Sequence, residues 1–234
     1  MSSRLIVESK NDKFFIQALV NYLKINNAQV SEINITDNSY FLLDGSDLTK
    51  LKRELERVKE QAQKILITKV GIILDIDYKQ PTEWFEVINN AVGEIFPEVQ
   101  ETKIETTSSF ITITTEELPD IQIACHLMNV NGTGELETIL KLIKSQPSPY
   151  ADCLESWKIC VEECIGKKIK SKDFDKLWVN NYIRHDTCTN QEKNHASEYC
   201  SVAKFDYVMN NKQHIWDFEH AALDELKEFL KLFN

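Results

Sequence analysis

VGIILDID, residues 70–77, places five largely apolar residues directly before an Asp-x-Asp pair. A continuous apolar run of this kind is typical of a central parallel strand that is covered on both faces of its sheet. Open α/β sheets bind their ligands at the carboxyl ends of such strands, where Asp75 and Asp77 fall in this sequence. The stretch therefore predicts both the class of fold and the place of a functional site.

The segments around this strand alternate between strand and helix patterns. Residues 4–8 form a second apolar run that ends in a carboxylate, and apolar residues at helical spacing follow from Phe14 to Leu23. The other predicted strands lie around 30–35, at 110–114 and at 121–127, and the other predicted helices lie at 47–64, at 82–96 and from 136 onward. The turn at 116–120 predicts a β-hairpin or sheet extension between the last two strands.

The two parts of the chain differ in pattern, because the sequence is helical almost throughout after Pro149. We therefore expect an α/β core at 1–146, with a mainly parallel sheet flanked by helices and a β-hairpin extension. A helical C-terminal region at 147–234 is expected to pack on that core.

Composition bounds the possible functions. The chain has 234 residues, 42% of them hydrophobic, and a net charge of −10. It has no apolar run long enough for a membrane span and no signal-peptide pattern, so the expected location is the cytoplasm, with no membrane partner. The six cysteines are interpreted as reduced thiols. A net negative charge disfavours simple nucleic-acid binding, because binding to phosphates needs a surplus of Lys and Arg. It is compatible with carboxylates that hold a divalent cation.

Four acidic residues form the candidate site. Glu8 ends the first predicted strand, Asp75 and Asp77 end the third, and Asp12 lies one helical turn beyond Glu8. Side chains two apart on a strand point the same way, so the two aspartates are expected to share a face. Carboxylate oxygens are the ligands that Mg²⁺ prefers. A lone Asp-x-Asp more often caps a turn, but two buried strands that both end in carboxylates favour a metal site.

These residues resemble the Toprim superfamily, which includes topoisomerases, bacterial primases, OLD-family nucleases and small RNA-maturation nucleases. The superfamily pattern is an apolar strand ending in Glu, usually followed by Gly, then an Asp, and later an apolar strand ending in Asp-x-Asp. The matching segments are 6–12, in which Ser9 replaces the glycine, and 73–77. A closer resemblance, over nearly the whole chain, is to an uncharacterised family of stand-alone Toprim-like proteins related to the OLD nucleases.

Further segments carry that closer resemblance: 126–137, 175–178, 215–217 and 223–226. Val130 stands where that family usually has an aspartate. The resemblance implies a Mg²⁺- or Mn²⁺-dependent nuclease that acts on DNA or RNA, with an ATPase as partner in defence or repair. It implies Glu8 as acid/base or metal ligand, Asp75 and Asp77 as metal carriers, and Glu137 as a weaker candidate. A lysine commonly assists in such nucleases, and four remain open: Lys10, Lys13, Lys69 and Lys79.

Other possible sites were weighed against simpler structural roles. Zinc ligand types occur at His185, Cys188, His195 and Cys200, but without the paired short spacing of a zinc finger. Three cysteines at helical intervals, at 153, 160 and 164, are interpreted as a stripe of core residues. The lysine-rich run at 167–172 is interpreted as a solvated loop rather than a phosphate-binding surface.

Two rival functions remain from the sequence alone. The first is a binding or regulatory module that keeps the Toprim shape without catalysis, which Val130, Ser9 and the acidic charge favour. The second is a primase-like nucleotidyl transferase, which the absence of zinc-ribbon and polymerase-like regions disfavours.

Overall fold

The computed structural model describes residues 2–32, 46–77, 79–98, 102–116 and 118–234. Its contacts divide the chain into two units, the first with residues 1–128 and 225–234 and the second with residues 129–224. The sequence instead placed the division at 146/147 and assigned the last helix to the C-terminal region. The last helix belongs to the first unit because its aromatic side chains contact the sheet, as described below.

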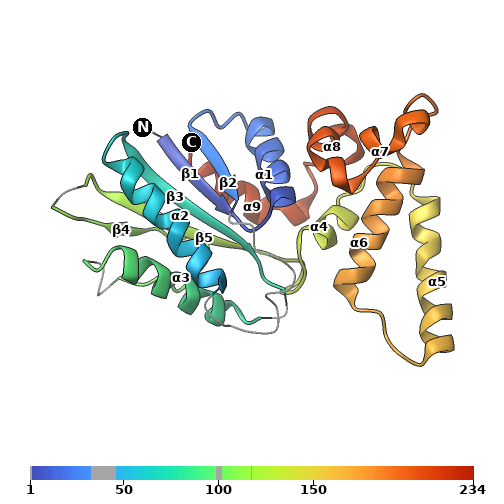
Figure 1. Cartoon of the computed structure of the whole chain (residues 1–234), viewed down its shortest axis with the longest axis horizontal. Coiled ribbons are helices and arrows are strands. Elements are labelled where there is room, and N and C mark those ends of the chain that lie inside the picture. Colours follow the sequence, from blue (N-terminus) through green and yellow to red (C-terminus); the bar gives the residue numbers. More distant parts are fainter. Residues whose placement is uncertain (1, 33–45, 78, 99–101, 117) are drawn as a thin grey trace. The chain divides into compact units, whose positions relative to one another are not determined.

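The first unit contains a five-stranded sheet in the order β2-β1-β3-β5-β4 (Figure 1). The strands are β1 (Ser2–Val7), β2 (Ala28–Glu32), β3 (Ile67–Asp75), β4 (Ile111–Ile113) and β5 (Ile121–Met128). All neighbouring pairs are parallel except β4 and β5, which are antiparallel. The mainly parallel α/β sheet and its hairpin are therefore confirmed. The part of the second predicted strand beyond residue 32 lies outside the described residues.

One face of the sheet is covered by α2 (Ser46–Ala62) and α3 (Pro81–Ile95), which pack on each other and lie in front of the strands in Figure 1. Alternate residues of the central strands face these helices, because side chains on a strand point to opposite faces in turn. The resulting core includes Ile6, Ile72, Leu74, Leu51, Leu55, Val58, Trp84, Ile88 and Val92.

The opposite face of β3 receives the end of the chain. Gly71 lies so close to other side chains that a Cβ there would be 2.6 Å from Leu5 Cδ2 and 2.7 Å from Phe233 Cζ. Phe229, on α9 (Asp224–Lys231), lies 5.4 Å from the ring of His126 on β5. Glycine in the middle of this strand thus lets the C-terminal aromatic residues approach the sheet.

The second unit is helical, as predicted for the C-terminal region. Its longer helices are α4 (Leu136–Leu142), α5 (Pro149–Ile165), α6 (Ser171–Asn181) and α8 (Phe205–Asn211), and its shorter turns are Tyr182–Asp186, Glu192–His195, Ala196–Tyr199, Val202–Lys204, Gln213–Ile215 and Ala221–Leu223. Its core contains a row of rings: Tyr182 lies 5.3 Å from Trp178 on one side and 5.3 Å from Trp216 on the other. Within the described parts of both units, no helix is long and apolar enough to cross a membrane.

The cysteine predictions need two corrections. Cys188 and Cys200 form a disulfide, so the interpretation of all six cysteines as reduced thiols is wrong for this pair. Residues 153, 160 and 164, predicted to be a core stripe, are exposed thiols on α5. Their helical spacing places these three cysteines on one face of α5. The opposite face of α5 is the one that packs against the other helices of the second unit.

Candidate functional site

The order of the strands in the sheet indicates where a ligand would bind. From β1 the chain moves to β2 on one side and later to β3 on the other side, so the β1–β3 boundary is the point where the winding direction changes. Open α/β sheets bind ligands at such switch points, beyond the carboxyl ends of the strands. Glu8 follows β1 directly and Asp75 is the last residue of β3.

Glu8 and Asp75 meet at this boundary. The backbone N–H of Asp75 donates a hydrogen bond to Glu8 Oε2, with an N–O distance of 3.0 Å. Both residues are buried, with 4% of Glu8 and 6% of Asp75 exposed. The bond joins residues that are 67 positions apart in the sequence, so it depends on the parallel pairing of β1 with β3. Glu8 and Asp75 therefore lie at the carboxyl ends of two neighbouring parallel strands.

Asp12 is held at the start of α1 (Lys10–Tyr22) by a capping box. The backbone N–H of Ser9 donates to Asp12 Oδ2 at 2.8 Å, and the backbone N–H of Asp12 donates to Ser9 Oγ at 3.3 Å. A glycine at position 9 could not supply this hydroxyl acceptor. Ser9, which departs from the Toprim pattern, thus anchors the turn between Glu8 and Asp12.

Asp77 does not lie on the strand, which corrects the reason given for its position. β3 ends at Asp75, and Asp77 has a φ of 51°, a left-handed conformation in which strand alternation no longer applies. The segment is held by Ile76, whose N–H donates to Met128 O and whose carbonyl accepts from Trp84 Nε1. Asp77 is 5% exposed, so it remains a buried carboxylate two residues beyond Asp75.

The four candidate lysines differ in their contacts. Lys13 forms an ion pair with Glu32 at 2.6 Å, and Lys69 donates to the carbonyl of Leu232 at 2.5 Å. Lys79 instead lies over the Trp84 ring, 4.0 Å from its centroid, and Lys10 lies 5.6 Å from the centroid of Phe14. An ammonium over a ring keeps donors for another ligand. The ring contacts of Lys10 and Lys79 therefore leave their ammonium groups able to donate to a ligand.

His126 is a buried titratable residue that the sequence argument did not single out as functional. It lies on β5 opposite Ile73, and burial lowers its pKa to about 4. Its ring packs against Phe229, so it is neutral near pH 7. A histidine in the middle of an apolar strand is the sequence signal for this role in the core.

A second acidic pair, in the second unit, begins α4. Glu137, the weaker candidate, lies in the first turn of α4 and is 9% exposed, so it is buried rather than on a solvated face of the helix. Glu135, which was not singled out, is 3% exposed and lies 3.0 Å from Lys172 Nζ and 3.9 Å from Lys176 Nζ. Burial, reinforced by the charge of Glu137, raises the pKa of Glu135 to about 8 despite these lysines.

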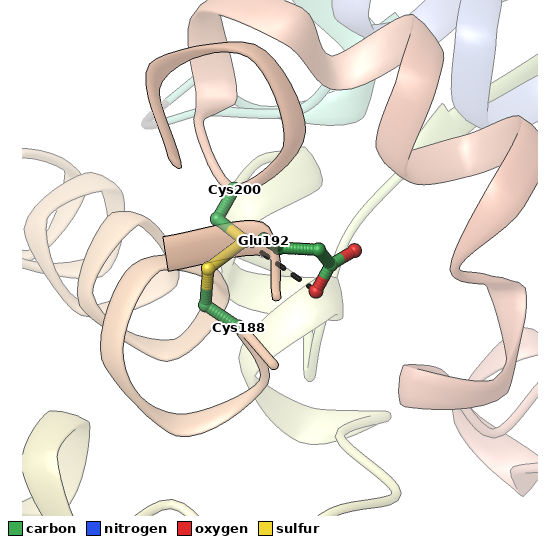
Figure 2. Close-up of side chains that lie close together, drawn as sticks. All are labelled: Cys188, Glu192 and Cys200. Atoms are coloured by element: carbon green, nitrogen blue, oxygen red, sulfur yellow. Dashed lines mark hydrogen bonds between the residues drawn. A yellow bond between two sulfur atoms is a disulfide. The ribbon is translucent and has the colours of Figure 1, made fainter. Parts of the chain in front are cut away.

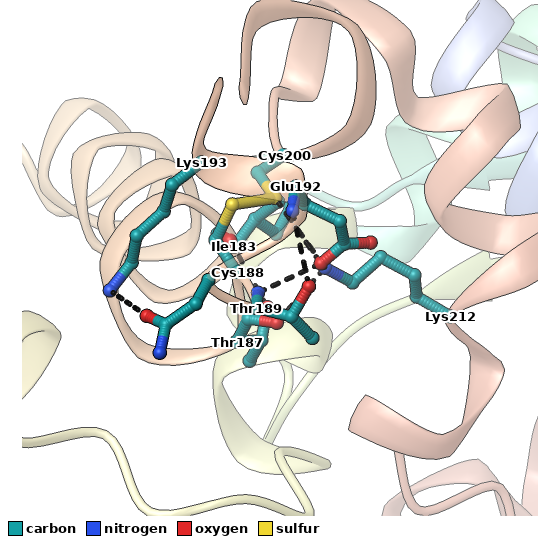
Figure 3. Close-up of a disulfide and its surroundings, with 9 residues drawn as sticks. Ile183, Thr187, Cys188, Thr189, Glu192, Lys193, Cys200 and Lys212 are labelled. Carbon is teal, nitrogen blue, oxygen red and sulfur yellow. Dashed lines mark hydrogen bonds and ion pairs between the residues drawn. A yellow bond between two sulfur atoms is a disulfide. The ribbon is translucent and has the colours of Figure 1, made fainter. Parts of the chain in front are cut away.

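Of the four residues considered as zinc ligands, the two cysteines lie together and the two histidines lie elsewhere. Cys188, Glu192 and Cys200 each offer a ligand atom within 4.8 Å of the others, and Figure 2 shows the carboxylate beside the disulfide. Lys212 Nζ lies 2.9 Å from Glu192 Oε2 and 3.5 Å from Cys200 Sγ, so an ammonium already accompanies the carboxylate (Figure 3). The group is therefore a covalent cross-link beside a partly buried ion pair.

The two histidines considered for zinc contact aromatic rings instead. His185 lies 5.8 Å from the ring of Tyr150, and His195 lies 6.2 Å from the ring of Tyr199. Neither belongs to the group formed by the two cysteines and the carboxylate.

These features define the chain as an α/β protein with buried carboxylates at the switch point of a mainly parallel sheet. Over residues 2–234 the chain matches the family described as "Protein of unknown function (DUF3226)", and it belongs to that family. No curated protein matches the chain. No solved structure matches it either.

Proposed function

We propose that this protein is a divalent-metal-dependent nuclease, a hydrolase that cuts or nicks the phosphodiesters of DNA or RNA in the cytoplasm with an ATPase as partner. The observation that carries the proposal is the contact between Glu8 and Asp75 at the switch point of the sheet. The Toprim resemblance, which rests on the same carboxylates, supports the class of reaction and the partner.

The residue types and their burial suit a hard divalent cation. Four carboxylates, Glu8, Asp12, Asp75 and Asp77, are each no more than 6% exposed. Buried carboxylates repel one another, and oxygen donors of this kind suit Mg²⁺ or Mn²⁺. We propose that Asp75 and Asp77 hold the cation and that Glu8 and Asp12 complete or orient the ligand set.

The chain's own groups would then have distinct tasks. The Asp75 N–H holds one oxygen of Glu8 and so orients this carboxylate, which acts on the attacking water as a base or through the metal. Ser9 holds Asp12 through the capping box and keeps the helix start fixed to the end of β1. A bound divalent ion would neutralise the charge on the phosphoryl oxygens. Lys10 or Lys79 would add a positive charge.

The test is cleavage of labelled DNA and RNA, single- and double-stranded, with Mn²⁺ or Mg²⁺, with and without a candidate ATPase partner. We expect the wild type to cleave, and Glu8→Gln or Asp77→Asn to lower the rate by at least about 100-fold, because each change removes a charge that the reaction needs. The matched control is Asp120→Asn, an exposed aspartate in the β4–β5 turn that loses the same charge. Full activity in Glu8→Gln would reject this site.

The second candidate function is a binding or regulatory module without turnover. Two observations favour it: the net charge of −10 and the role of Val130. Val130 closes a tight turn, in which its N–H donates to Thr133 O at 2.7 Å, so it acts structurally where the related family usually has an aspartate. Metal binding without cleavage of any substrate in the panel would favour this module.

A further inference from the structure

The disulfide between Cys188 and Cys200 lies beside a buried ammonium group (Figure 3). Lys212 follows the end of α8 and is 3% exposed. Its Nζ donates to Thr187 O at 2.9 Å, to Glu192 Oε2 at 2.9 Å and to Cys200 Sγ at 3.5 Å, so each of the three ammonium donors has an acceptor. The covalent bond itself does not need a cation at its sulfur. A thiolate formed when the bond breaks would be stabilised by one.

The two sulfur atoms of this disulfide differ in access and in surroundings. Cys188 is 7% exposed, whereas Cys200 is fully buried. A thiol from solvent therefore reaches Cys188 Sγ more readily, and Cys200 would then be the leaving group. The Cys200 thiolate would form next to Lys212, where a charge-assisted hydrogen bond would replace a weak contact to a neutral sulfur. A leaving thiolate that is stabilised in this way makes a disulfide easier to reduce.

We propose that Cys188 and Cys200 form a reversible thiol–disulfide switch, in which a small thiol such as glutathione reduces the bond and Lys212 holds Cys200 as the thiolate. The thiolate of one glutathione attacks Cys188 Sγ, the S–S bond breaks, and Cys200 leaves with the electron pair. A second glutathione thiolate attacks the glutathione sulfur of this mixed disulfide and releases Cys188, so oxidised glutathione is the other product. The two glutathione thiols supply two electrons. One of their protons goes to Cys188 and the other goes to solvent.

The contacts of Lys212 also allow the segment between the cysteines to survive reduction. Thr187 directly precedes Cys188, and Glu192 begins the turn Glu192–His195 inside the closed segment. Lys212 binds both of these residues as well as Cys200, so it joins the two ends of the segment without the covalent bond. Reduction should therefore release the cross-link while the second unit stays folded, and oxidised glutathione should form the bond again.

Glu192 and Lys212 should have opposite effects on reduction, although they form one ion pair. Glu192 Oε2 lies 3.8 Å from Cys200 Sγ and 2.9 Å from Lys212 Nζ. Its negative charge disfavours a thiolate at Cys200, whereas the ammonium favours one. Loss of the lysine charge should therefore favour the disulfide, and loss of the glutamate charge should favour the dithiol. An ion pair that only supports the fold would give shifts of the same sign.

The experiment equilibrates the folded full chain in buffers that contain reduced and oxidised glutathione at a series of ratios. Differential alkylation and mass spectrometry of peptides give the reduced fraction of Cys188 and Cys200, separately from the exposed thiols of α5. We expect the wild type to change reversibly from disulfide to dithiol within this series. Lys212→Met should lower the equilibrium constant for reduction by about 10-fold or more, because it removes a charge-assisted hydrogen bond. Glu192→Gln should raise this constant.

Lys193→Met is the matched control for the lysine change. Lys193 is exposed in the same segment and donates to Asn190 Oδ1 at 3.3 Å. This variant loses the same charge as Lys212→Met at a side chain with a different partner, so it should match the wild type. Unchanged circular dichroism of the oxidised variants shows that a shift in the equilibrium is not lost folding.

Each of four outcomes would overturn the proposal. The wild-type disulfide could stay intact at the most reducing ratio, as a structural disulfide does. Lys212→Met and Glu192→Gln could shift the equilibrium in the same direction, or Lys193→Met could shift it as much as Lys212→Met. Zinc bound by the reduced protein at one ion per chain, and lost in Cys188→Ser/Cys200→Ser, would assign the pair to a metal site. If Lys212→Met does not fold, a lowered equilibrium constant in Glu192→Gln rejects the proposal by itself.

Discussion

At the scale of single residues, burial decides the charge state of the titratable groups. Glu135 and His126 show opposite effects, because burial disfavours the charged form of each. The pKa of Glu135 rises to about 8, which favours a protonated carboxyl, and that of His126 falls to about 4, which favours a neutral imidazole. Their contributions to stability therefore depend on pH with opposite signs.

Glu135→Gln should flatten the dependence of stability on pH above about pH 6.5. The folded protein keeps a proton on Glu135 up to about pH 8, whereas the unfolded chain releases it near 4.5. The wild type's free energy of unfolding should therefore fall as the pH rises from 4.5 to 8. His126 acts in the opposite direction between about 4 and 6.5, so the range from 6.5 to 8 isolates Glu135.

The measurement is urea unfolding at several pH values, followed by tryptophan fluorescence. Three of the four tryptophans, Trp157, Trp178 and Trp216, lie in the second unit together with Glu135, so this signal reports the relevant unit. An equal slope in Glu135→Gln and wild type would show that Glu135 is ionised in the folded protein.

At the scale of elements, two features of the fold cannot be predicted from the local pattern of apolar residues. One is the close approach of two segments, and the other is a disulfide that joins two turns. Gly71 is needed where β3 meets the C-terminal aromatic residues, whereas Gly93 lies in α3 with no atom within 4 Å of the position of a Cβ. The disulfide between Cys188 and Cys200 joins two turns of the second unit across 12 residues.

Gly71→Ala and Gly93→Ala should change stability in opposite directions. The new methyl group at position 71 would overlap Leu5 and Phe233 and should lower the free energy of unfolding by about 1–3 kcal/mol. At position 93 the methyl group meets open space in a helix, and the change should raise stability by about 0.4–1 kcal/mol. Chemical denaturation followed by circular dichroism measures both, and a stabilised Gly71→Ala would contradict the packing described here.

Removal of the Cys188–Cys200 disulfide should destabilise the second unit. For a closed loop of about this length, the loss of the cross-link should cost about 2–3 kcal/mol. The comparison is thermal melting of the wild type with and without a reductant, alongside the Cys188→Ser/Cys200→Ser double variant. The reductant should lower the melting temperature of the wild type but leave that of the double variant unchanged. Equal sensitivity of both proteins would place the effect at other thiols.

At the scale of the whole molecule, the two units carry different kinds of site. The first unit brings buried carboxylates to the edge of a parallel sheet, and the second unit contains the acidic pair on α4 and the exposed cysteines of α5. Ligand binding at the carboxylates should stabilise the first unit by mass action, because the unfolded chain has no preformed site.

Manganese should raise the melting temperature of the wild type. In the proposed site, buried carboxylates would repel one another, and a bound cation would relieve that repulsion in the folded state alone. At a metal concentration about 100 times the dissociation constant, the gain is about 2.7 kcal/mol. The Asp75→Asn/Asp77→Asn variant should lose the response and Asp120→Asn should keep it. A melting temperature that Mn²⁺ leaves unchanged, or a rise retained in the double variant, would argue against the metal site.

The sequence by itself determined the α/β class, the succession of strands and helices, the β4–β5 hairpin and the positions of Glu8 and Asp75 at strand ends. Those features follow from the local period of apolar residues, which a single segment carries. The sequence placed Asp77 on the strand with Asp75, whereas the strand ends at Asp75 and no glycine signals the positive φ of Asp77.

Only the tertiary structure decided which strands are neighbours, and so which carboxylates meet. It also decided that Cys188 bonds to Cys200, that Glu135 and Glu137 are buried, and that α5 turns its cysteines outward. Helical spacing shows that residues share a face, but the packing of other helices selects the face that is covered. Such contacts join residues that are distant in the chain, and no local pattern of apolar and polar residues encodes those distances.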